Sequence, residues 1–78
     1  MDCSNVQGMD DRARQAARDE IAKLESSNRQ IQYDLRQKEG LLPGYPADKR
    51  AGLENEIRGL RLAISANEQR VRDFQRQL

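Results

Sequence analysis

Few side chains in this sequence are able to carry out catalysis, and none of them lies in a recognised motif. The 78 residues include no His, so no imidazole is present to act as a base near neutral pH. The hydroxyl groups stand outside any nucleophile motif. They belong to Ser4, Ser26, Ser27, Ser65, Tyr33 and Tyr45. We therefore expect a protein that is not an enzyme and has no small-molecule substrate.

Residues suited to metal or cofactor chemistry are equally scarce. A metal site needs clustered His or Cys side chains, or a loop that gathers several carboxylates, and the sequence offers neither. Cys3 is the only cysteine, which excludes an internal disulfide and favours a reducing cytoplasm as the location. No apolar run approaches 18 residues. We predict no metal, no cofactor and no membrane partner.

The chain is organised as two helical stretches around one turn. Pro and Gly gather in the segment GLLPGYPADKR, and residues 9–39 contain neither. We predict a flexible tail over residues 1–8, a helix over 9–39, a turn over 40–46 and a helix over 46–77. Gly40 is expected to end the first helix in the left-handed conformation, and Pro46 to begin the second. The fold class is therefore an all-α helical hairpin.

Both helices carry a repeat with alternating spacings of four and three residues, which we call the seam. In the first helix the seam comprises Ala17, Ile21, Leu24, Asn28, Ile31, Leu35, Lys38 and Leu42. In the second helix it comprises Leu53, Ile57, Leu60, Ile64, Asn67, Val71, Phe74 and Leu78. This spacing is typical of a coiled coil, and a short turn makes the two helices antiparallel.

Two registers of the hairpin are compatible with this seam. We favour the register that places Leu35 opposite Leu53, because it allows the first helix to end at Gly40. The alternative places Asn28 opposite Asn67 and requires the helix to continue past Gly40. We interpret the two asparagines as residues that fix the register and the oligomeric state, at some cost in stability.

A second stripe, made of small residues, runs along the second helix. Gly52, Gly59 and Ala66 recur at a spacing of seven, although a glycine inside a helix costs about 0.5–1 kcal/mol relative to alanine. One explanation for these small residues is that another helix must approach the second helix (residues 46–77) closely at these positions. The alternative explanation is a coding bias toward Gly and Ala. The predicted partner interface comprises Gly52, Gly59, Leu62, Ala63, Ala66 and Tyr33.

Arginines gather where the two helix ends meet in the favoured register. We call this predicted cluster the arginine pole, and it comprises Arg12, Arg14, Arg18, Arg70, Arg72 and Arg76. Phosphate groups bind such clusters, which makes nucleic acid an alternative partner. The net charge of +1 and the acidic residues among these arginines favour the other interpretation, in which the charges support the helices.

A chain of 9.0 kDa with 4% aromatic residues buries too little surface for comfortable stability on its own. Pairing two hairpins into a four-helix bundle remedies this. The leading hypothesis is therefore a non-enzymatic interaction protein, an adaptor, chaperone or inhibitor, that acts by helix docking on another protein or on a second copy of itself. A nucleic-acid-binding dimer and a self-assembling structural subunit are the alternatives.

Overall fold

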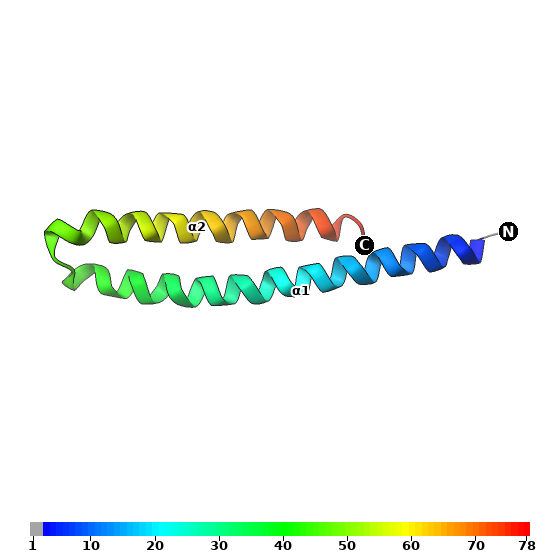
Figure 1. The fold of residues 1–78 in the computed structure, drawn as a ribbon, viewed down its shortest axis with the longest axis horizontal. Coiled ribbons are helices and arrows are strands. Elements are labelled where there is room, and N and C mark those ends of the chain that lie inside the picture. Colours follow the sequence, from blue (N-terminus) through cyan, green and yellow to red (C-terminus); the bar gives the residue numbers. More distant parts are fainter. Residues whose placement is uncertain (1–2) are drawn as a thin grey trace.

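The protein is a single helical hairpin in the computed structural model, which describes the backbone of residues 3–78 and the side chains of residues 11–78. Helix α1 (Cys3–Leu41) leads through the short 3-10 helix η1 (Leu42–Gly44) into helix α2 (Ala47–Gln75). The two long helices pack side by side and antiparallel in a rod of 69 × 14 × 11 Å (Figure 1). The predicted all-α helical hairpin is confirmed.

Both helices differ somewhat from their predicted bounds. Helix α1 begins at Cys3, whereas we expected a flexible tail over residues 1–8; of that tail, residues 1–2 lie outside the described part. Nothing between Cys3 and Met9 breaks a helix except Gly8, which a helix tolerates at about 1 kcal/mol. Within the described residues, no helix combines the length and the apolar character needed to cross a membrane.

The expected stop signal at Gly40 is wrong. Helix α1 continues through Gly40 to Leu41, and no glycine in the described part of the chain has a positive φ. The chain turns instead at Pro43, which lacks an N–H group and disfavours helical geometry at the preceding residue. The backbone N–H of Tyr45 then donates to the carbonyl oxygen of Leu42 at 3.1 Å, which closes η1.

Helix α2 begins one residue later than predicted. Pro46 is its N-cap, with φ −58° and ψ 140°, and Ala47 is the first helical residue. The carbonyl oxygen of Pro46 accepts the backbone N–H of Lys49 at 3.0 Å, so the cap still closes the first turn. Asp48 places a carboxylate in that turn, where the helix dipole favours negative charge.

The seam forms the contact between α1 and α2, as predicted. Its most buried members are Ala17, Leu24, Asn28, Leu53, Ile57 and Val71. Its half-buried members are Ile21, Ile31, Leu35, Lys38, Leu42, Leu60, Ile64, Asn67 and Phe74, while Leu78 is exposed. Because a rod of two helices has no second layer, no side chain of the described residues reaches full burial.

The register is the alternative one, so the favoured register is wrong. The side-chain amide of Asn67 donates to Oδ1 of Asn28 at 2.9 Å. Leu35 lies seven residues after Asn28, and Leu60 lies seven residues before Asn67. In an antiparallel hairpin, the asparagine contact therefore places Leu35 opposite Leu60 rather than opposite Leu53. In the rejected register each asparagine faces an apolar residue, and an unpaired buried amide costs about 1–3 kcal/mol. Extending α1 past Gly40 avoids that cost.

Candidate interaction surfaces

Two ion pairs that cross between the helices mark the two sides of the seam. On one side, Nζ of Lys38 lies 3.7 Å from Oε2 of Glu56. On the other side, the guanidinium of Arg61 binds the carboxylate of Glu39. Glu56 directly precedes a seam residue, whereas Glu39 and Arg61 directly follow one. In an antiparallel coiled coil, residues that precede seam positions share one side, and residues that follow them share the other.

The asparagine pair is the polar centre of the seam. Asn28 is 8% exposed, and its Nδ2 lies 3.5 Å from the carbonyl oxygen of Ile64 in addition to the bond from Asn67. Among the described residues, no buried side-chain nitrogen or oxygen lacks a hydrogen-bond partner. The structure thus brings together the two seam residues that the sequence singled out, while their role in fixing the register remains a prediction.

The small residues of α2 lie together on the side marked by Lys38 and Glu56. Because Gly52, Gly59, Ala63 and Ala66 each directly precede a seam residue, we call this side the small-residue face. Gly52, Gly59 and Ala66 are exposed, and a Cβ atom added to either glycine meets nothing within 4 Å. The hairpin itself therefore does not need glycine at either position.

Leu62 and Tyr33 each lie midway between two seam residues, on the outer surface of their own helix, and so border the small-residue face rather than belong to it. Leu62 adjoins it on α2 and is 65% exposed. Tyr33 is 67% exposed but lies on α1, in a shallow hollow of about 340 Å³ that it shares with Arg29, Gln32 and Arg36. Since Arg29, Gln32 and Arg36 all follow seam residues, the hollow opens toward the other side of the rod. The structure does not place Tyr33 with the small residues of α2.

The predicted arginine pole is not a single cluster. With the two asparagines opposite each other, α2 ends level with about Glu20 of α1 and Leu78 lies level with about Ala17, so the N-terminal part of α1 extends beyond them (Figure 1). Arg12 and Arg14 therefore have no part of α2 beside them, and Arg14 pairs with Asp11 at 3.5 Å. The pole was a consequence of the wrong register.

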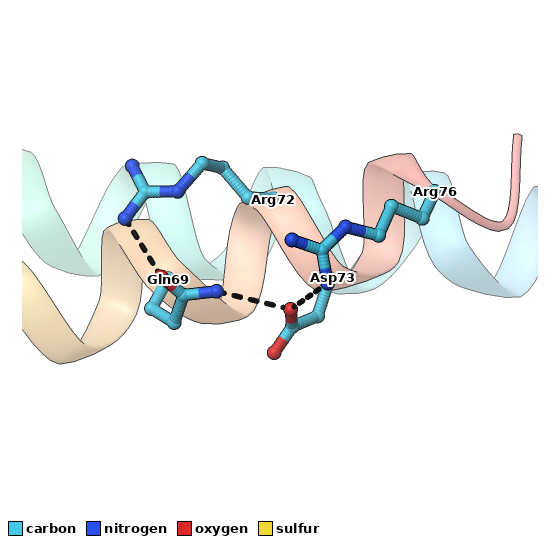
Figure 2. Close-up of polar contacts among 4 residues, drawn as sticks. All are labelled: Gln69, Arg72, Asp73 and Arg76. Carbon is cyan, nitrogen blue, oxygen red and sulfur yellow. Dashed lines mark hydrogen bonds and ion pairs between the residues drawn. The ribbon is translucent and has the colours of Figure 1, made fainter.

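Arg72 and Arg76, near the end of α2, are bound by neighbours on the same helix, whereas Arg70 directly precedes a seam residue and lies on the small-residue face. Figure 2 shows a chain of contacts in which Arg72 donates to Gln69 at 2.9 Å and Gln69 donates to Asp73 at 3.1 Å. Arg76 approaches the same Asp73 oxygen at 3.1 Å. Each of these contacts spans three or four residues, so they support the helix end.

A different set of arginines shares one side of the rod. Arg18, Arg29 and Arg36 of α1 each directly follow a seam residue, and so do Arg58, Arg61 and Arg72 of α2. None of the three lysines does. We call the side marked by Glu39 and Arg61 the arginine face. The sequence contained this signal, but it is visible only when each charge is assigned a position relative to the seam.

The arginine face is hollowed between the helices. A groove of about 440 Å³ has Asn28 and Val71 in its lining, together with Glu25, Arg29, Gln32, Glu68 and Arg72. A second groove nearer the turn, of about 290 Å³, is lined by Leu42, Glu54, Ile57, Arg58 and Arg61. Both grooves are open and shallow, so they suit an extended partner rather than an enclosed small molecule.

Within the described residues, no group of three or more His, Cys, Asp or Glu side chains is placed to hold a metal ion. The two candidate interaction surfaces are the small-residue face and the arginine face. Comparisons with protein-family models, with curated proteins and with solved structures found no match to this chain.

Proposed function

We propose that this chain is a non-enzymatic protein-interaction module of the cytoplasm, which acts by docking its small-residue face onto other helices. The observation that carries the proposal is the incomplete core: the seam contains mostly half-buried residues, and no side chain of the described part is fully buried. Burying apolar surface stabilises a fold by about 25 cal/mol per Å². A further helical layer supplies the burial that two helices alone do not.

The first docking partner we propose is a second copy of the chain, in a four-helix bundle. A two-fold axis along the rod sets α1 of one copy against α2 of the other, so that all neighbouring helices are antiparallel. Gln37 then lies level with Gly59 of the second copy, and Gln30 with Ala66. Long side chains thus meet gaps left by small ones, which explains glycine at positions where the hairpin has no use for it.

Charges on this face are compatible with the same arrangement. Lys23 lies level with Asp73 of the second copy, and both side chains belong to the small-residue face. Exposed pairs of this kind contribute only about 0–1 kcal/mol, so they orient the docked helices more than they stabilise them. The expected contact is therefore driven by close helix packing, with the charges selecting the direction of approach.

Substitution of Gly59 tests this proposal. Gly59→Leu fills the gap on the small-residue face, and we expect association to weaken at least tenfold, as measured by sedimentation velocity over a concentration series. Gly59→Ala keeps the gap nearly open and should leave association close to that of the parent chain. Helicity followed by circular dichroism should not fall, because leucine and alanine both form helices better than glycine.

The matched control is Ser65→Leu, which adds a leucine to the same helix at an exposed position of the arginine face. This variant should associate like the parent chain. If Gly59→Leu and Ser65→Leu weaken association equally, the small-residue face is not the docking surface. Growth of the parent chain into filaments of increasing mass would favour a self-assembling subunit over a docking module.

A further inference from the structure

More than half of the arginines of this chain lie on one side of the rod. Six of the eleven arginines directly follow a seam residue, one (Arg70) directly precedes one, and none of the three lysines follows one. General attraction to negative charge is served equally by lysine and arginine. The planar guanidinium group differs in that it holds a phosphate through two parallel hydrogen bonds and stacks on flat rings. The arginine face therefore concentrates the side chains best suited to binding phosphate.

The middle of the arginine face is free of carboxylates. Residues 57–67 of α2 contain no acidic residue, and residues 26–38 of α1 contain only Asp34. Asp34 directly precedes a seam residue, so it belongs to the opposite side, and it lies 3.5 Å from Nζ of Lys38. Glu25 and Glu68 lie at one end of this carboxylate-free stretch. Glu39, which pairs with Arg61, lies at the other end.

Several cations within this stretch are not neutralised by the hairpin. Among the residues whose side chains are described, Arg29 and Arg36 take part in no hydrogen bond or ion pair. Arg58 donates only to the neutral amide oxygen of Asn55, at 3.2 Å. The whole chain is nearly neutral, so this local excess of positive charge is a property of one face rather than of the composition.

An exposed aromatic ring completes the stretch. Tyr33 is the most exposed of the large hydrophobic side chains described, and it lies between Arg29, four residues before it, and Arg36, three residues after it. Together with Gln32 these residues line one hollow. An aromatic ring flanked by free guanidinium groups is the arrangement that binds single-stranded nucleic acids, because bases stack on the ring while arginines contact the phosphates.

We propose that the arginine face binds a short stretch of single-stranded nucleic acid. Arg29, Arg36 and Arg58 contact phosphate oxygens, and one base stacks on Tyr33. Arg29 and Arg36 are seven residues apart, about 10 Å along the helix, which leaves room for a stacked nucleotide between them. The carboxylates of an acidic peptide suit the arginines, but a nucleotide strand joins every phosphate to a flat base that stacks on Tyr33, so the nucleotide strand accounts for more of the face.

Tyrosine fluorescence tests this proposal directly. The chain has two tyrosines and no tryptophan, so Tyr45→Phe leaves Tyr33 as the only tyrosine reporter. Titration of this variant with a 12-nucleotide oligothymidylate at low salt should quench Tyr33. Adding Arg29→Ala and Arg36→Ala should weaken binding at least tenfold. It should also reduce the slope of log affinity against log salt by about 1.4, since each single-strand phosphate contact contributes roughly 0.7.

The matched control removes two arginines from the rejected pole. Arg14→Ala with Arg76→Ala lowers the net charge by the same amount, yet both residues lie away from the carboxylate-free stretch and pair with Asp11 and Asp73. This variant should bind the oligonucleotide as the parent does. Equal weakening by the two pairs of substitutions would overturn the proposal, because it would show that net charge alone governs binding.

Two further ligands distinguish binding through phosphates alone from binding that includes base stacking on Tyr33. Inorganic polyphosphate, which lacks bases, should bind more weakly than the oligonucleotide and leave Tyr33 fluorescence unchanged. A DNA duplex of the same length, whose bases are already stacked, should also bind more weakly. Tighter binding of either ligand, or no binding of the single strand at low salt, would overturn the proposal. Gly59→Leu serves as an independent variant, because failure of helix docking should leave oligonucleotide binding intact.

Discussion

At the scale of single residues, the contact between Asn28 and Asn67 decides how the hairpin is assembled. Each asparagine satisfies part of the other's hydrogen-bonding capacity inside the seam. Buried polar pairs are often no more stable than apolar residues of similar size, but breaking one by removing a single partner is costly. The pair is thus expected to contribute specificity rather than net stability.

A double-mutant cycle tests this expectation. Asn28→Leu alone leaves the half-buried amide of Asn67 facing an apolar side chain, and should lower the free energy of unfolding by about 1–2 kcal/mol. The double variant, Asn28→Leu with Asn67→Leu, should be at least as stable as the parent chain. Urea denaturation followed by circular dichroism measures both values. Additive effects of the two single substitutions would show that the amides do not interact.

At the scale of the elements, the sequence was sufficient for the helices and the seam but not for the register. A strict spacing of four and three identifies the buried stripe of each helix, because that spacing is a local property of helix geometry. The register is set by the free energies of contacts between residues that are far apart in the sequence. The local preference of Gly40 for a helix end opposes the pairing of Asn28 with Asn67, and the pairing is the larger effect.

The wrong register also led to the prediction of the arginine pole. A shift of seven residues moves the helix ends apart by about 10 Å, which separates Arg12 and Arg14 from α2. The arginine face was missed for another reason: its members are spread over both helices and become neighbours only across the seam. The small-residue face depends on one helix alone, so the register does not change its members, and its role as a partner interface stays a prediction.

Engineered cysteine pairs test the register. In a Cys3→Ser background, Leu35→Cys with Leu60→Cys should oxidise readily to an internal disulfide, because these positions face each other in the observed register. Leu35→Cys with Leu53→Cys should oxidise far more slowly, since its members are offset by about 10 Å and cysteines must be close to be bridged. Mass spectrometry at low protein concentration measures both rates. Faster bridging of the second pair would contradict the observed register.

At the scale of the whole molecule, the rod has two faces of different chemistry on opposite sides of one seam. The small-residue face offers close packing to helices, and the arginine face offers guanidinium groups and one exposed ring. Docking on the first face covers neither Arg29 nor Arg36, so the two proposed interactions are compatible in one assembly. A dimer formed through the small-residue faces turns its arginine faces outward on both sides.

Thermal unfolding measures whether the stability of the hairpin depends on a second copy. Since the described residues include no fully buried side chain, docking of a second copy should supply much of the stability, and the Tm should then rise with protein concentration. Using about 0.7 kcal/mol of unfolding enthalpy per residue for both copies, a tenfold increase in concentration should raise the Tm by roughly 4–5 °C. Gly59→Leu should abolish this dependence, whereas Ser65→Leu should keep it. A Tm that does not change with concentration in the parent chain would show that the second copy is not the docking partner.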